Sequence, residues 1–290
     1  MPDLSKAVDQ AKLRVEKARA SYGVVDIGVR TFKRFSEDDG GFYSAALTYY
    51  VFFSMFPLLI FATAVLGFVT QVYPDVEQNL LKEGLQSFPL IGSVIEPDVL
   101  RSLRGSAGRL AALSIVLALY SGSGAVVALG HALNKIHRVE EEGNFLVKRL
   151  DALKWLALFA LMVLGSLVVS GWAQWVPGWG ATILSLLVGI ALNLAIFATA
   201  FKFLPHMKRS WSDVLPGALI AAGIFELLKW FGTLYLSRGA EARSATFGAF
   251  ATAAGLLIAS YLLAQITLLS AEVNAVLAER RVTRQSLTGE

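Results

Sequence analysis

The sequence contains no cysteine, only three histidines, and none of the short motifs that mark common classes of enzyme. Without cysteine the chain can form no disulfide, thiolate metal site or cysteine nucleophile, and His131, His137 and His206 are too few for a histidine-rich metal centre. The patterns GxSxG, HExxH and GxGxxG and the Walker loop are also absent. The sequence therefore predicts no enzyme, no cofactor and no ATP-driven pump, so that any transport is passive, ion-coupled or driven by another subunit.

Charged residues are also scarce, at 17% of the 290 residues, whereas 55% are hydrophobic and the mean hydropathy is +0.58. Soluble globular domains carry about 25% charged residues, so this balance favours an integral membrane protein. The net charge of +4 and the pI near 9.3 fit either an anionic membrane surface or a nucleic acid. Only the distribution of the charges along the chain separates these two partners.

Six segments are long and apolar enough to cross a bilayer as helices, which requires about 20 predominantly apolar residues. No stretch shows the alternation over about ten residues that a transmembrane strand needs. The sequence therefore predicts an all-α integral membrane protein with six transmembrane helices. The predicted spans cover residues 44–70, 109–131, 153–175, 181–204, 213–236 and 247–277.

The transmembrane domain is expected to cover residues 44–278, with polar segments at both ends and one inside it. Residues 1–43 are basic and carry apolar residues three and four apart, which predicts an amphipathic helix on the membrane surface and no cleaved signal peptide. Three prolines interrupt residues 72–108, which favours short extracytoplasmic helices over a further span. Residues 279–290 are expected to form a cytoplasmic tail.

Lysine and arginine are distributed unevenly between the two sides of this six-helix arrangement. The side with both termini, the 132–150 loop and the 202–212 loop carries 18 of them, and the opposite side carries 6. Because cytoplasmic segments are enriched in lysine and arginine, both termini are predicted to be cytoplasmic. The same bias explains the basic pI, so we expect membrane lipids as partners and no nucleic acid.

Three polar residues lie deep within the predicted fourth and fifth spans. Glu226 and Lys229 are three residues apart, so they share a helix face and can form a local ion pair. Glu226 lies about 20 Å along its helix from the cytoplasmic start, and Asn193 reaches a similar depth in the fourth span. Two interpretations stay open: a polar cavity for a substrate, or simple hydrogen bonding between helices.

Further polar residues lie in the predicted sixth span. Glu272 and Asn274 are near its cytoplasmic end, where pairing of the carboxylate with a basic neighbour such as Arg280 is the simpler interpretation. Gln265 lies deeper in the same helix and fits either a structural or a substrate-binding role.

Proline and glycine mark points where the helices are expected to bend, hinge or pack closely. A proline inside the first span removes a backbone hydrogen bond, and two glycines in the second span permit either close packing or local unwinding. Prolines at the end of the fourth span and the start of the fifth predict a tight cytoplasmic hairpin. These candidates are Pro57, Gly122, Gly124, Pro205, Pro216 and Gly217.

Five stretches of the chain carry a family resemblance. They are AALTYYVFFSMFPLLIF in the first span, ALNKIHRV after the second, FKFLPHMKRSWSDVLPGALIAAGIFELLKWFGTLYL across the hairpin, ATFGAF, and LLSAEVNAV in the last span. Together they resemble the YihY/BrkB family of bacterial inner-membrane proteins, from about residue 30 to 278.

The resemblance implies a six-helix protein of the bacterial inner membrane. Similarity to members linked with envelope lipids implies transport of a lipid or other amphiphile. An older label of the family, ribonuclease BN, is not carried over, because hydrolysis of RNA needs a metal cluster or an acid–base pair that this sequence does not supply. Within the family signature, Glu272 is then either a structural tie or a cytoplasmic gate.

Three functional hypotheses follow. The first is a transporter or flippase-like protein, with a polar cleft for the headgroup of an amphiphilic substrate. The second is a non-transporting scaffold in envelope biogenesis, whose basic N-terminal helix recruits a partner or anionic lipid. The third, and weakest, is a membrane-bound hydrolase. A polar cavity open to the bilayer supports the first hypothesis, and a tightly packed bundle with paired polar groups supports the second.

Overall fold

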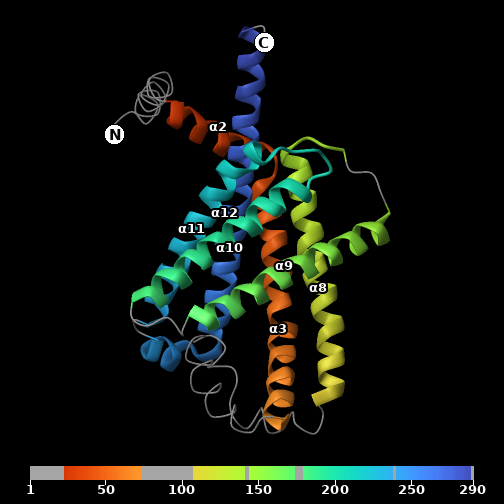
Figure 1. Ribbon diagram of the computed structural model, residues 1–290, viewed down its shortest axis with the longest axis vertical. Helices are drawn as coiled ribbons and strands as arrows, with labels where there is room; N and C mark the ends of the chain where they lie inside the picture. Colours follow the sequence, from red (N-terminus) through yellow and green to blue (C-terminus); the bar gives the residue numbers. More distant parts are fainter. Residues whose placement is uncertain (1–22, 73–106, 141–143, 174–178, 238–239, 289–290) are drawn as a thin grey trace, which may run out of the picture.

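The computed structural model describes residues 23–72, 107–140, 144–173, 179–237 and 240–288, and every regular element in these ranges is an α-helix (Figure 1). The all-α class predicted from the sequence is therefore confirmed for the described residues. The helices are α2 (Gly23–Glu37), α3 (Gly40–Val72), α8 (Ala107–Ile136), α9 (Phe145–Ala173), α10 (Trp179–Phe203), α11 (Trp211–Ser237) and α12 (Ala240–Thr288).

Each of the six predicted spans coincides with one of the helices α3 and α8 to α12. Four described helices contain a stretch that is long and apolar enough to cross a membrane, and these stretches support a multi-pass membrane protein. They are Ala112–Ile136 in α8, Leu186–Phe203 in α10, Trp211–Lys229 in α11 and Ala253–Thr283 in α12. The full count of six spans stays a prediction.

Two predicted features fall wholly or largely outside the described residues. They are the short helices expected within 72–108 and the part of the N-terminal amphipathic helix that precedes Gly23. The segment expected as a C-terminal tail is helical through Thr288, because α12 continues past the last predicted span without a break.

The long helices α3, α8 and α12 run along the long axis of the molecule, and α9 and α10 cross them obliquely (Figure 1). α3 packs along α8, and α12 packs against α11, α3, α2 and α8. α2 lies across one end of the bundle, beside the C-terminal part of α12. The loops that follow α8 and α10 are at this same end, so four segments from distant parts of the chain meet there.

Small residues allow the helices to approach closely at their crossings. Ala218, Ala221 and Ala222 of α11 and Ala271 of α12 are all buried, and Leu268 of α12 is fully enclosed. Outside this core, large apolar side chains of α8 and α10 are exposed, as expected for surfaces that face lipid. Close packing therefore sets how far apart α11 and α12 can lie, and this distance positions the polar contacts described next.

Candidate functional site

Arg34 joins three helices at the end of the bundle where α2 lies. Its Nε donates to Glu272 of α12 over 3.2 Å, and its Nη2 donates to the carbonyl oxygen of Ile136 at the end of α8 over 2.8 Å. Its Nη1 donates to Glu279, about two turns further along α12. Burial lowers the pKa of Arg34, but Glu279 and Glu272 outweigh that effect, so the pKa rises above its ordinary value. The guanidinium stays charged and fastens α2 to α8 and α12.

Glu272 is completely buried, with an exposed fraction of 0%, so its carboxyl group needs a hydrogen-bonding partner. Arg34 supplies that partner, while Oε1 of Glu272 has no hydrogen bond among the described residues. The basic neighbour is thus Arg34 of α2. Arg280, the partner named from the sequence, instead pairs with Asp26.

Asn274 clamps α12 onto the first turns of α11. Its Oδ1 accepts from the Gly217 N–H over 2.7 Å, and its Nδ2 donates to the Val214 carbonyl over 3.1 Å. A Cβ at Gly217 would overlap the carbonyl oxygen of Ser270, so only glycine permits this approach. The side chain of Asn274 therefore fixes where α11 and α12 cross.

The start of α11 is held by capping contacts. The Ser212 N–H donates to Oγ of Ser210 over 3.1 Å, as at an N-cap, and the Ser210 N–H donates to the carboxylate of Asp213 over 3.3 Å, which is the returning contact of a capping box. Pro216 has no N–H to offer the Ser212 carbonyl four residues earlier, and Arg281 of α12 donates to that oxygen over 3.2 Å. The hairpin is thus tied to α12 at the Ser212 carbonyl and at Gly217.

The loop between α10 and α11 is also tied to the end of α8. Oδ1 of Asn134 accepts from the His206 N–H over 2.7 Å, and Nδ2 of Asn134 lies 2.8 Å from Nδ1 of His206. α8 ends in a Schellman motif, in which Arg138 N–H donates to Lys135 O and Val139 N–H donates to Asn134 O. Arg138 stands at the left-handed position of that motif, with φ of 54°, where glycine is usual.

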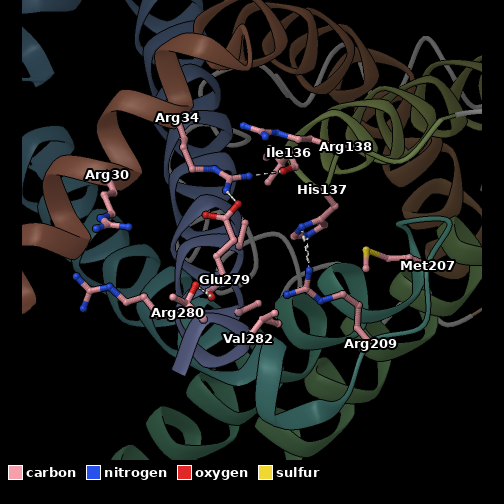
Figure 2. Close-up of a pocket in the computed structure, with 13 residues that line it drawn as sticks. Arg30, Arg34, Ile136, His137, Arg138, Met207, Arg209, Glu279, Arg280 and Val282 are labelled. Atoms are coloured by element: carbon pink, nitrogen blue, oxygen red, sulfur yellow. Dashed lines mark hydrogen bonds and ion pairs between the residues drawn. The ribbon is translucent and has the colours of Figure 1, made fainter. Parts of the chain in front are cut away.

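His137 and Arg209 face each other from these two loops, as Figure 2 shows. Nη1 of Arg209 lies 2.9 Å from Nδ1 of His137. Burial, together with the charges of Arg209 and Arg34, lowers the pKa of His137 to about 3. Burial also lowers the pKa of Arg209, an effect that Asp213 partly offsets. Since an arginine can only donate, the neutral imidazole is the form that can accept its hydrogen bond.

These segments surround a cavity of about 700 Å³ that is open to the outside (Figure 2). Five arginines line it against a single carboxylate, that of Glu279. Its size is typical of small-molecule sites, and the chemistry it offers is recognition of an anion beside an apolar wall. The arginines are Arg30, Arg34, Arg138, Arg209 and Arg280.

Asn193, Glu226 and Lys229 come together away from this cavity, between α10 and α11. Nδ2 of Asn193 donates to Oε1 of Glu226, and Nζ of Lys229 lies 2.8 Å from the same oxygen. The Lys229 side chain is 46% exposed and that of Glu226 is 20% exposed. The structure brings the three predicted residues together as a hydrogen-bonded group that is open on one side.

The chain matches the family described as Virulence factor BrkB over residues 31–290. It belongs to the BrkB family. The ribonuclease-like protein YfkH of Bacillus subtilis (strain 168) is 27% identical, over 86% of this chain and 94% of YfkH. The inner membrane protein YhjD of Escherichia coli (strain K12) is 26% identical, over 92% of this chain and 85% of YhjD. A UPF0761 membrane protein of Stenotrophomonas maltophilia (strain R551-3) is 27% identical, over 94% of this chain and 66% of that protein.

No solved structure matches the chain significantly. The names of YhjD and of the Stenotrophomonas protein agree with the four apolar spans in describing a membrane protein. The BrkB family chain is therefore a membrane protein, as the resemblance implied.

The remaining predicted residues of this BrkB family chain have local contacts. Nε2 of Gln265 donates to the Tyr261 hydroxyl over 3.0 Å. α3 continues as helix through Pro57, and Pro205 is buried in the loop after α10. α8 is continuous through Gly122 and Gly124. A Cβ at Gly124 would press on the Tyr50 ring of α3, and one at Gly122 would lie 3.1 Å from Leu156 of α9.

Sequence reasoning did not single out the residues of the cavity. Arg34, Arg138 and Arg209 entered only as charges in the orientation count, and His137 only as one of three histidines. For His137, Arg138 and Arg209 the available signal was their position inside the stretches that resemble the family, ALNKIHRV and the HMKRSWSD part of the hairpin stretch. Glu272 and Asn274, which were singled out, lie beside the cavity and hold its helices in place.

Proposed function

We propose that this BrkB family chain is a non-catalytic transporter or flippase-like protein that moves a lipid or other amphiphile across the inner membrane, with both termini cytoplasmic. The observation that carries the proposal is the polar group of Asn193, Glu226 and Lys229 within the spans of α10 and α11. Ionisable groups within a membrane are costly, and they generally mark a path for a polar substrate.

The position and exposure of this group support a path more than a structural tie. Glu226 comes 15 residues after the start of α11, about 22 Å along the helix axis. A tie between helices would enclose both charges, whereas the Lys229 side chain is 46% exposed. A charged group that is open on the outside of a helix pair can accompany a headgroup while the acyl chains stay in lipid.

The test is transport of labelled lipids in liposomes by the purified full-length chain and by Glu226→Gln. The amide keeps the shape and the Asn193 contact but loses the charge, so we expect transport to fall about tenfold or more, equivalent to about 1.4 kcal/mol on the barrier. Folding, measured as melting temperature in detergent, should be little changed. Full transport by a stable Glu226→Gln protein would contradict a role for this residue.

A matched control exists in α9. Asp151 and Lys154 have the same three-residue spacing and lie 2.6 Å apart, but both are exposed, at 53% and 77%. Asp151→Asn removes an equivalent charge outside the polar group, and transport should stay at the wild-type level. If Glu226→Gln unfolds the protein and neutralising Lys229 as well restores it, the pair is a structural tie, and the scaffold function replaces the transporter.

A further inference from the structure

The five arginines of the cavity are not equally neutralised. Arg30 lies 2.8 Å from Asp26, and Arg280 pairs with the same carboxylate. Arg34 is held by two glutamates of α12. In the described part of the chain, no carboxylate lies within ion-pair distance of the two remaining arginines, Arg138 and Arg209. Among the five arginines these two are therefore the least neutralised, with Asp38 and Glu140 around a neighbouring hollow beside Arg138 and with the charge of Asp213 acting on Arg209.

Arg209 presents a pair of donors without acceptors. Its Nη1 is engaged by His137, whereas its Nε and Nη2 are buried and have no hydrogen-bond partner in the described residues. The nearby acid, Asp213, is taken by Arg281 at 2.7 Å. Nε and Nη2 form the side-on edge of a guanidinium, which is the edge that binds two oxygens of a phosphate or carboxylate at once. Unpaired buried N–H groups of this kind cost stability, and these two donors are placed to pair with two oxygens of one ligand.

The backbone of Arg138 is strained, which is a second unfavourable feature of the cavity beside the unpaired donors of Arg209. It occupies the left-handed position of a Schellman motif, where a side chain is strained and glycine is preferred. Backbone strain of this kind concentrates at functional sites. The strained residue is also one of those that line the cavity, as Arg209 is. This position is consistent with a functional role for Arg138.

The cavity also has an apolar side. Met207 and Val282 line it and are 40% and 66% exposed. Trp211 begins α11 directly after the loop that carries Met207 and Arg209, and Lys202 lies 4.3 Å from its ring centre. Tryptophan rings at helix ends are typical of the membrane–water interface. An anion that binds here would thus lie at headgroup level, with apolar surface available for a hydrocarbon chain.

We propose that the cavity binds the phosphate group of an anionic lipid, with Arg209 Nε and Nη2 and the Arg138 guanidinium as donors and with Met207 and Val282 against the acyl chain. His137 holds the plane of Arg209. This inference rests on the proposed function, since it names the class of headgroup that the transporter would take up at the end of the bundle where the cavity lies.

The experiment measures binding, independently of transport. The purified full-length chain in a neutral detergent is titrated with phosphatidic acid and with phosphatidylcholine of the same chains, and the melting temperature is followed. We expect stabilisation by phosphatidic acid only, with an apparent affinity about tenfold weaker in Arg209→Gln and in Arg138→Gln. Lys33→Gln, the same charge change at an exposed position of α2, should bind like the wild type.

Two variants keep the test informative if a substitution affects folding. Without lipid, Arg209→Gln should melt at the wild-type temperature or above, because it removes unpaired buried donors. Arg138→Gly should melt higher than the wild type, because it removes the left-handed strain, and should still lose the response to phosphatidic acid. Arg138→Ala keeps the strain and separates it from the loss of charge.

The possible outcomes divide clearly. Equal stabilisation by phosphatidic acid and phosphatidylcholine, or an unchanged response in both arginine variants, overturns the site. Equal stabilisation by inorganic phosphate assigns the arginines to a soluble phosphate compound and overturns the lipid. If Glu226→Gln leaves transport unchanged and phosphatidic acid still binds, the proposed function is overturned and the binding site is retained. If the wild type transports lipid but shows no binding of phosphatidic acid, the binding site is overturned and the proposed function is retained.

Discussion

At the scale of single residues, the structure contains two kinds of polar residue. Some hold the helices together, and others keep unpaired hydrogen-bond donors or a strained backbone. Asn274 and Arg34 each satisfy several partners on other helices. Arg209 has two buried N–H groups without acceptors in the described residues, and Arg138 has a strained backbone. The first kind of residue explains the fold, and the second kind indicates where a ligand binds.

His137 gives a prediction on pH dependence. Its pKa is about 3 in the folded chain, because it is buried beside Arg209 and Arg34, and about 6.5 when unfolded. Below pH 6.5 the unfolded chain therefore binds a proton that the folded chain does not, so stability falls as the pH drops from about 6.5 toward 3. Denaturation in detergent at pH 7.5 and pH 5 should show a loss of about 1 kcal/mol or more.

The control for this effect is His137→Gln, which keeps an acceptor for Arg209 and cannot titrate. The variant should lose less stability than the wild type between pH 7.5 and pH 5. Identical pH profiles for the two proteins would mean that His137 is not responsible for the loss.

At the scale of elements, the crossing of α11 and α12 decides the geometry of the site. Gly217 permits the close approach to Ser270, and Asn274 bonds the Gly217 N–H and the Val214 carbonyl in the first turns of α11. In α2 the buried face is partly polar. This face carries Asp26 and Arg34, while apolar Phe32 is exposed, so an amphipathic pattern alone does not say which face turns toward the protein.

Gly217→Ala tests the crossing. Its methyl group would overlap the backbone of α12, so the substitution should destabilise the protein by about 1 to 3 kcal/mol, measured as unfolding in detergent. Gly223→Ala, two turns further along the same helix, meets no atom within 4 Å and should stabilise the helix by about 0.5 to 1 kcal/mol. Equal effects of the two alanines would rule out Gly217 as the residue that sets the crossing.

At the scale of the whole molecule, the arginines of the cavity lie at one end of the bundle. α2, the loop after α8, the loop after α10 and the last turns of α12 all lie at this end (Figure 1). The excess of lysine and arginine on this side predicts that it faces the cytoplasm. The proposed phosphate site would then take up lipid from the inner leaflet.

The natural absence of cysteine makes this orientation easy to test. Trp179 is the first residue of α10, Lys208 lies in the loop that follows this helix, and both positions are exposed. Each is changed to cysteine in turn. In intact cells whose outer membrane has been made permeable, a membrane-impermeant maleimide should label position 179. Position 208 should react only after the inner membrane is opened. The reverse pattern would overturn the orientation and would move the arginine cavity to the outer side.

The sequence by itself determined the all-helical class, the positions of the long apolar helices and the family. Hydropathy and helix length depend only on residues that are consecutive in the chain, and both can be compared with the known thickness of a bilayer. They can therefore be predicted from the sequence alone. It also singled out Glu226, Glu272 and Asn274, because polar residues are conspicuous in apolar helices.

Only the tertiary structure decided what these residues contact and where the cavity lies. Arg34 and Glu272 are 238 positions apart, and His137 and Arg209 are 72 positions apart. Nothing in local composition relates such residues, because their approach depends on how helices cross and on which small side chains permit it. That two of the five arginines have no carboxylate within ion-pair distance among the described residues becomes visible only once the other three are seen to be paired.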